Sequence, residues 1–294
     1  MMKYSIYPGC SMEATAQANL KSIEAVAKAL DLHLEEIPDW NCCGATVASG
    51  VVGDFTQQVM TARNLAIAET KGWDVVVGCS SCYLSLAVTN KRFKEDEHFK
   101  VKANEALAAG GYKYNGSLRV RQFLEVVIND VGFDNIKAKV KKSLAGLKVA
   151  GYVGCQTVRA IPYEFDDPEY PVQMDKLMEA LGATATDFPM KARCCGSSNA
   201  IAATEIVIDQ AYKIFESASK GGADVIVTPC PMCQLNLDAY EQMVNQKYGT
   251  NFNLPILFFT QLMAIAFDLP ADAQALSYCI NSPYQALASY GVAR

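Results

Sequence analysis

The stretch Gly72–Leu86, GWDVVVGCSSCYLSL, is an apolar run that ends in two closely spaced cysteines, Cys79 and Cys82. Residues 75–77 are three consecutive valines, so both faces of the expected strand are apolar. Such a strand is typical of a parallel sheet that is covered by helices on both sides. The stretch therefore predicts an α/β fold in which a cysteine loop follows a buried parallel strand.

The chain contains a second copy of this arrangement. The stretch GADVIVTPCPMCQLNL at 222–237 repeats the valine-rich run and its two cysteines. Upstream, YSIYPGC at 4–10 corresponds to VAGYVGC at 149–155, and the CCG at 42–44 recurs at 194–196. Self-similarity at a fixed spacing indicates two copies of one structural unit.

The apolar spacing within each copy predicts alternating helices and strands. Helical spacing covers 15–32, 54–73, 172–183 and 204–222, and residues 32–38 alternate like a strand. We expect two related units with small parallel sheets and flanking helices, over residues 1–100 and 147–294, the second ending in a C-terminal helical segment. Residues 101–146 are expected to form an insertion or linker region, with a helix over 120–130.

Composition limits the function classes. The net charge of −5 argues against a broad nucleic-acid-binding surface. The apolar segment 254–269 is shorter than the roughly 20 residues that cross a bilayer, so we expect a buried or partner-facing helix and no membrane span. The N-terminus does not read as a signal peptide, which favours the cytoplasm. Thiols stay reduced there, so the eleven cysteines are expected to be metal or redox ligands.

Ten of these cysteines are expected to converge, because ligands collect at the carboxyl ends of parallel strands. The first cysteine set comprises Cys10, Cys42, Cys43, Cys79 and Cys82, and the second cysteine set comprises Cys155, Cys194, Cys195, Cys230 and Cys233. Cys279 has no counterpart in the repeat and is interpreted as a packed thiol.

Five thiols per set narrow the choice of metal. A structural zinc site takes four ligands, and a cubane iron–sulfur cluster has four irons for four thiolates. The fifth thiol is unexplained unless the cluster is not a simple cube or one thiol is a free nucleophile. This favours an unusual iron–sulfur cluster over zinc or an ordinary cubane. A glycine follows each cysteine pair, at Gly44 and Gly196, where the missing Cβ would let the backbone approach a bulky cofactor.

The full pattern is C-x31-CC-x35-C-x2-C followed by C-x38-CC-x34-C-x2-C. It resembles the paired CCG domains of the B subunit of heterodisulfide reductase and of heterodisulfide-reductase-like homologues. The resemblance implies a noncubane [4Fe–4S] cluster in each set, with one thiolate bridging irons. It also implies a disulfide oxidoreductase of methanogenesis that cleaves a coenzyme M–coenzyme B type disulfide between the two clusters. Electrons would arrive from the C subunit, which carries cubane iron–sulfur clusters, and ultimately from the flavin-containing A subunit.

One position departs from the pattern that this resemblance implies. Archetypal members are expected to read G-C-H-x-x-R-P, whereas this chain reads GCQTVRAIP, with Gln156 in place of the histidine and Arg159 matching the arginine. A glutamine cannot deliver a proton near neutral pH. This leaves room for another disulfide or a sulfane-sulfur carrier, as in the related complexes of sulfur oxidation. Arg159, Arg193 and Gln156 are the candidate substrate-binding residues; the two arginines would bind an anionic group, or they form structural salt bridges.

The sequence also indicates dependence on other proteins of a complex. It contains no glycine-rich dinucleotide or P-loop motif and no closely spaced ferredoxin run of cysteines. His33 and His98 lie in a strand-like and a charged segment and are interpreted as structural or solvated. The rival hypothesis is a non-catalytic CCG electron-transfer subunit. The retention of all five thiols in both copies favours catalysis over that rival.

Overall fold

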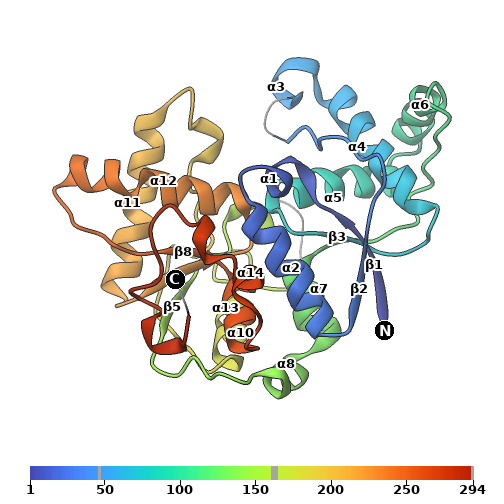
Figure 1. The fold of residues 1–294 in the computed structure, drawn as a ribbon. Helices are drawn as coiled ribbons and strands as arrows, with labels where there is room; N and C mark the ends of the chain where they lie inside the picture. Colours follow the sequence, from blue (N-terminus) through green and yellow to red (C-terminus); the bar gives the residue numbers. More distant parts are fainter. Residues whose placement is uncertain (46–47, 160–164, 293–294) are drawn as a thin grey trace.

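Two four-stranded parallel sheets organise the chain in the computed structural model, which describes residues 1–45, 48–159 and 165–292 (Figure 1). The first sheet has the order β2-β1-β3-β4, with β1 Met2–Tyr7, β2 Leu32–Glu36, β3 Val75–Val77 and β4 Val120–Gln122. The second has the order β6-β5-β7-β8, with β5 Lys148–Gly151, β6 Thr184–Ala185, β7 Val225–Thr228 and β8 Ile256–Phe258. The shared order confirms the predicted α/β fold of two related units.

Helices lie between the strands in both units. The first unit contains α1 Gly9–Glu13, α2 Gln17–Ala29, α3 Ala48–Val52, α4 Asp54–Glu69, α5 Ser80–Glu95, α6 Glu97–Ala108, α7 Phe123–Val126 with a π-helical turn at Val127–Val131, and α8 Phe133–Lys139. The second contains α9 Cys155–Val158, α10 Gln173–Ala180, α11 Thr204–Lys220, α12 Pro231–Tyr248, α13 Phe259–Ala266 and α14 Ala271–Gln274, with 3₁₀ turns at Ser197–Asn199, Leu276–Tyr278 and Ala288–Tyr290. The four helices expected from apolar spacing correspond to α2, α4, α10 and α11.

The valine run of β3 is buried from both sides, as its composition predicts. Val76 packs in one core cluster with residues of α2 and α7, whereas Val75 and Val77 pack in the other with residues of α4 and α5. All three valines are fully buried. Alternate side chains of a strand point to opposite faces, so a strand covered on both faces carries apolar residues throughout.

The predicted linker region supplies a strand of the first sheet. Within residues 101–146, Val120–Gln122 forms β4 and pairs in parallel with β3. The helix expected over 120–130 therefore begins only at Phe123. The β4–α7 pair occupies the same place in the first sheet as β8–α13 in the second. The repeated unit therefore continues beyond its last cysteine and includes one more strand and helix.

The apolar segment 254–269 also differs from the expectation of a single helix. Ile256–Phe258 is the edge strand β8, and only Phe259–Ala266 is helical. Every residue of α13 is buried. The helix therefore packs in the core of this chain, which supports the buried interpretation, and Asp268 and Leu269 at the end of the segment reach the surface.

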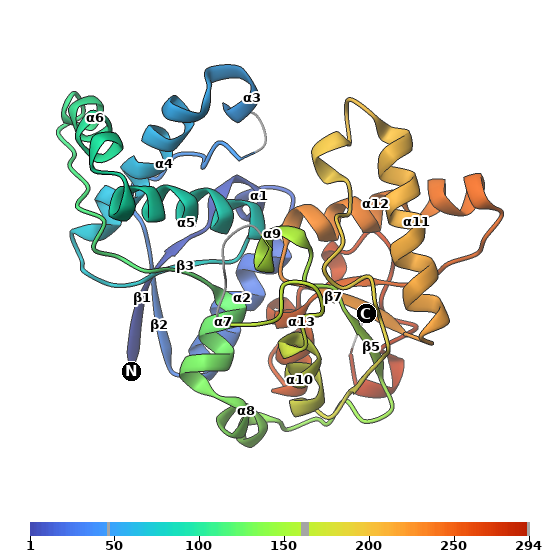
Figure 2. The ribbon, with the colours of Figure 1, turned by 180° about the vertical axis from the view of Figure 1, so that it is seen from behind.

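The two units share this core. The rings of Phe123 in α7 and Phe259 in α13 lie 6.3 Å apart, and the buried hydroxyls of Ser22 and Thr260 are 2.6 Å apart. One core cluster contains apolar side chains from both units. The shared core consequently fixes the position of one sheet relative to the other, so the two units lie side by side (Figure 2).

Candidate functional site

The two C-x-x-C motifs lie at the start of long helices. Cys79 caps α5 and Cys230 caps α12, which places Cys82 and Cys233 in the first turn of each helix. Residues three apart lie on the same face of a helix, so both sulfurs of a motif point to one site. Helix N-termini carry unpaired N–H groups and a partial positive charge, which stabilise thiolates.

The two CCG turns hold the exposed cysteine of each pair in the same way. Gly44 and Gly196 adopt φ of +72° and +84°, a left-handed conformation that favours glycine. Their N–H groups donate to the Sγ atoms of Cys42 at 3.4 Å and Cys194 at 3.3 Å. The glycine is thus required by the turn itself, which is a reason that the sequence interpretation did not include.

A second pair of glycines makes room for sulfur. Gly9 and Gly154 precede the first cysteine of each set and have φ of +71° and +75°. A Cβ added at Gly9 would lie 3.0 Å from the Sγ of Cys82, and one at Gly154 would lie 3.3 Å from the Sγ of Cys233. Each glycine therefore lets the sulfur of the last cysteine of its set approach the backbone next to the first cysteine of that set.

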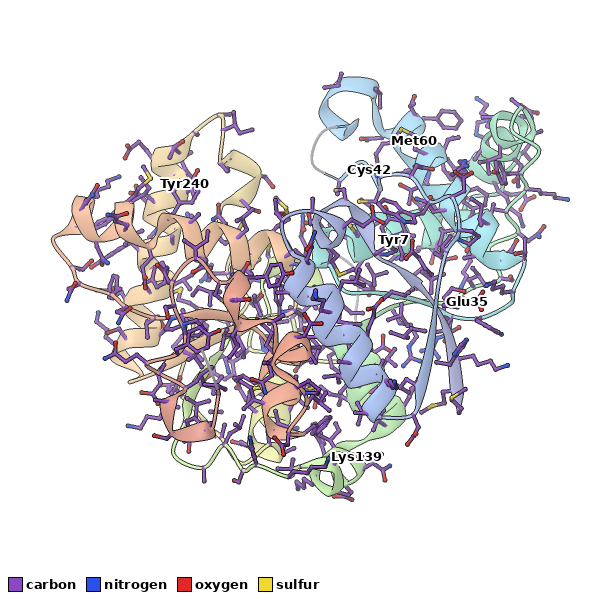
Figure 3. The ribbon with its side chains drawn as sticks, in the orientation of Figure 1. Tyr7, Glu35, Cys42, Met60, Lys139 and Tyr240 are labelled. Atoms are coloured by element: carbon purple, nitrogen blue, oxygen red, sulfur yellow. The ribbon has the colours of Figure 1, made fainter. Side chains whose placement is uncertain are left out.

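Two buried tyrosines that sequence analysis missed complete the repeated design. The Tyr7 hydroxyl donates to the carbonyl oxygen of Asn41 at 2.8 Å, and Tyr152 donates to that of Arg193 at 2.6 Å. Asn41 and Arg193 directly precede the two cysteine pairs, so each tyrosine fixes the entry to its CCG turn. Figure 3 shows Tyr7 and Cys42 close together. The signal was present, since both tyrosines stand three residues before the first cysteine of their set.

The structure brings together all ten predicted cysteines. In the first set Cys43, Cys79 and Cys82 are buried and Cys10 and Cys42 are exposed. In the second set Cys195, Cys230 and Cys233 are buried, Cys155 is half-buried and Cys194 is exposed. The Sγ atoms of Cys43 and Cys82 are 3.4 Å apart, and those of Cys195 and Cys233 are 3.6 Å apart. Cys279 is half-buried and lies outside both sets, as its interpretation as a packed thiol requires.

Sulfur–sulfur hydrogen bonds share protons unevenly within each set. The pKa of Cys43 is lowered, chiefly by its hydrogen bonds with Cys42 and Cys82. The pKa of Cys42 is raised, chiefly by the same bond with Cys43 and by burial. In the second set the pKa of Cys195 is lowered and that of Cys233 is raised, chiefly by the bond between them. Metal ligation requires thiolates, so metal binding would release the shared protons.

The two cysteine sets meet at the middle of the molecule. Helices α5 and α12 run outward from there in opposite directions (Figure 1), and Cys79 and Cys230 at their starts are close enough for each thiol to shift the pKa of the other. Beside this contact α9 packs against α5 (Figure 2). The hydroxyls of Ser80 and Thr157 are 2.6 Å apart, and Ser81 donates to Oε1 of Gln156 at 2.5 Å. The junction between the units is therefore made by thiols, hydroxyls and an amide.

A small cavity lies at this junction. Its walls come mainly from the second unit, including Gln156 and cysteines of the second set, and Ser80 and Ser81 close it from the first unit's side. Its volume of about 20 Å³ has room for one or two water molecules. Gln156, singled out from sequence, thus lies between the two sets.

The two predicted arginines have different surroundings. Arg159 is half-buried and forms an ion pair with Glu169 at 2.6 Å. Arg193 is exposed, and no acidic side chain of the described residues pairs with it. The backbone carbonyl oxygen of Arg193 accepts the Tyr152 hydroxyl and so helps to hold the second CCG turn. Binding of an anionic substrate by either guanidinium stays a prediction.

The donor chemistry decides which metal group fits. Within residues 1–45, 48–159 and 165–292, no three Cys, His, Asp or Glu side chains are arranged to hold a single metal ion. Each set nevertheless offers five thiols beside a helix N-terminus and a glycine that admits sulfur. Thiolates are the protein ligands of iron–sulfur clusters. The cysteine sets therefore fit the iron–sulfur group expected from the sequence, and their role as ligands stays a prediction.

The fold and the site define a class: proteins built from two α/β units that each present a cysteine-rich loop cluster. The profile of the CCG cysteine-rich domain family matches residues 4–87 and 149–238, which together make up more than half of the chain. The chain belongs to this family.

Relatives of known name cover nearly the whole chain. The sequence is 34% identical over 94% of its length to the 8-methylmenaquinol:fumarate reductase membrane anchor subunit of Wolinella succinogenes, covering 96% of that protein. It is 29% identical to the B subunit of a CoB-CoM heterodisulfide reductase of Methanosarcina acetivorans, covering 92% of this chain and 91% of that one. It is 30% identical to a protein of Archaeoglobus profundus that is named as like the B subunit of heterodisulfide reductase, with 94% of both chains covered.

A solved structure shares the fold. A hypothetical protein from Helicobacter pylori superposes with a TM-score of 0.76 at 14% identity, over 95% of this chain and 52% of that one. In the present chain, none of the described helices has the length and apolarity needed to cross a bilayer.

Proposed function

We propose that this chain is the two-cluster iron–sulfur subunit of a multi-subunit oxidoreductase, and that it reductively cleaves a disulfide at the junction of its cysteine sets. The observation that carries the proposal is the junction at which Ser80 and Ser81 bond to Thr157 and Gln156 and Cys79 neighbours Cys230, which brings two complete thiol sets together. The named heterodisulfide reductase relatives support the same reaction class. The cofactors in this proposal are two noncubane [4Fe–4S] clusters, one per set.

The reaction needs two electrons and two protons. A disulfide R–S–S–R′ takes up both electrons as its sulfur–sulfur bond breaks, and each sulfur then takes a proton to become a thiol. The bound clusters supply one-electron redox chemistry. The electrons originate in partner proteins of the complex, one with cubane iron–sulfur clusters and one with a flavin. Water supplies the protons, because Gln156 has no proton to give near neutral pH.

The chain's own residues position this chemistry. The N-termini of α5 and α12 face the junction and favour the negative charge that develops on sulfur. The Ser81–Gln156 hydrogen bond closes the junction on one side. A departing sulfur would therefore meet amide and hydroxyl dipoles.

A second candidate is electron relay within a reductase of the quinol:fumarate type. The relative named as a fumarate reductase anchor is more similar in sequence than the heterodisulfide reductase relatives named above. The cavity between the cysteine sets is also small. In this role the clusters would pass electrons between partner proteins, and no disulfide would react.

Disulfide titration of the partly reduced, cluster-containing protein separates these functions. We expect a paramagnetic state, seen by EPR spectroscopy, that appears only with a disulfide, because the two electrons of the cleavage would be delivered one at a time and the halfway stage would have an odd number of electrons. The disulfides tested should include the mixed disulfide of coenzyme M and coenzyme B. Thioether analogues of the same length, which lack a cleavable bond, are the matched control. Identical spectra with disulfides and thioethers would contradict cleavage and favour relay.

A further inference from the structure

An open groove adjoins the junction from the side of the first unit. Its volume is about 230 Å³, and it lies along α5. Ser81 and Gln156 line both this groove and the small cavity at the second cysteine set. Their hydrogen bond is therefore the partition between an open groove and the cysteine junction.

The groove also reaches the first cysteine set. Gln57 lines it, and the side-chain amide of Gln57 donates to the carbonyl oxygen of Cys43 at 2.8 Å. A ligand in the groove would thus lie beside residues that contact both sets. This is a position from which a bound molecule could reach the junction.

The described lining of the groove carries no charge. Its polar members are three amides and three hydroxyls, Gln57, Gln58, Gln156, Ser81, Ser85 and Thr89, and the remainder are small or branched apolar side chains. Arg92 lies outside the lining and donates to Oε1 of Gln58, which is part of it, at 3.0 Å. The Arg92 charge is compensated by Asp96 at 3.3 Å. Nothing described in the lining would balance a charged ligand.

One hydroxyl in this lining lacks a partner. Thr89 is fully buried beneath the groove, and its Oγ1 atom has no hydrogen-bond partner among the described residues. A buried polar atom without a partner costs free energy, and a ligand that supplied a hydrogen bond would recover it. Together with the amides, this favours a ligand that has its own uncharged donors and acceptors.

We propose that this groove binds an uncharged disulfide that carries hydroxyl or amide substituents, and that Ser81 and Gln156 admit it to the junction. The proposal rests on the function proposed above and names its substrate class. Burying an ammonium or a carboxylate here would leave that charge without a counter-ion, which is costly. An uncharged polar disulfide meets matching dipoles instead.

Three disulfides of similar length test the charge preference. The probes are bis(2-hydroxyethyl) disulfide, which is neutral, cystamine, which carries two ammonium groups, and 3,3′-dithiodipropionate, which carries two carboxylates. Equilibrium binding to the oxidised, cluster-containing protein is measured by calorimetry, so no turnover is needed. We expect the neutral probe to bind at least about tenfold more tightly than either charged probe. Equal or tighter binding of a charged probe, or no binding of the neutral one, would overturn the proposal.

Variants locate the binding to the groove. Val88→Trp fills the groove and should weaken binding of the neutral probe at least about tenfold, whereas Val101→Trp, on the exposed face of α6, should leave it unchanged. Thr89→Val removes only the unpartnered hydroxyl, and we expect about fivefold weaker binding with unchanged or higher stability. Unchanged affinity in both groove variants would show that the probe binds elsewhere.

These measurements separate the groove from the reaction. Binding of the neutral probe without a disulfide-dependent EPR state would support the groove and contradict disulfide cleavage. A disulfide-dependent EPR state produced only by a charged probe would support cleavage and contradict an uncharged substrate.

Discussion

Replacing Cys194 and Cys195 with alanine is expected to halve the iron content of protein purified without oxygen. The unchanged protein should contain about eight irons and comparable sulfide, from two four-iron clusters. The double substitution leaves three thiols in the second set, one fewer than a four-iron cluster requires. The first set draws all of its thiols from the other unit and should keep about four irons. Metal analysis and sulfide determination measure both quantities.

Two controls accompany this experiment. The mirror-image Cys42→Ala/Cys43→Ala variant should also lose half of the iron, because the two sets are equivalent in the repeat. Cys279→Ala should lose none, because Cys279 lies outside both sets. Stoichiometric zinc with negligible iron in the unchanged protein would refute the iron–sulfur interpretation outright.

Lys191→Met is expected to destabilise the fold strongly. The Lys191 side chain is 1% exposed, and its ammonium group pairs with the largely buried carboxylate of Asp175 and lies 4.3 Å from the centre of the Tyr170 ring. Removing one partner of a buried pair leaves the other charge without compensation, which costs about 3–5 kcal/mol. Lys191 also lies at the entry to the second cysteine set, where its carbonyl oxygen accepts the N–H groups of Val153 and Gly154. The midpoint of urea unfolding should therefore fall clearly.

The pH dependence of this variant has a defined sign. Burial raises the pKa of Asp175, so its folded-state pKa lies above the unfolded value. Without Lys191, the carboxylate is costly above that pKa, and the cost disappears as pH falls through it and the carboxyl becomes neutral. The variant should lose less stability at pH 5 than at pH 7.5.

Lys21→Met is the matched control for Lys191→Met. Lys21 pairs with the exposed Asp272 at 2.6 Å, and solvent compensates either charge when the other is removed. We expect little change in its unfolding midpoint. Equal midpoints for the two variants would contradict a structural role for the buried pair.

The sequence by itself determined the repeat, the parallel strands and the membership of both cysteine sets. The reason is that each depends on local order: β3 must be apolar on both faces, and the first turn of α5 brings Cys79 and Cys82 together whatever the rest of the chain does. A strand as short as Val120–Gln122 carries too little periodicity to be told from the helix that follows it.

Only the tertiary structure decided how the two units meet. The contact between Cys79 and Cys230, and the position of Gln156 opposite Ser81, depend on a core built from α7 and α13, whose sequences lie far from any cysteine of the two sets. The burial of Lys191 likewise depends on the helix that carries Asp175. Packing between segments that are distant in the sequence sets these contacts and this burial, and the spacing of residues along the sequence does not show them. The junction and its groove therefore became visible only in the folded protein.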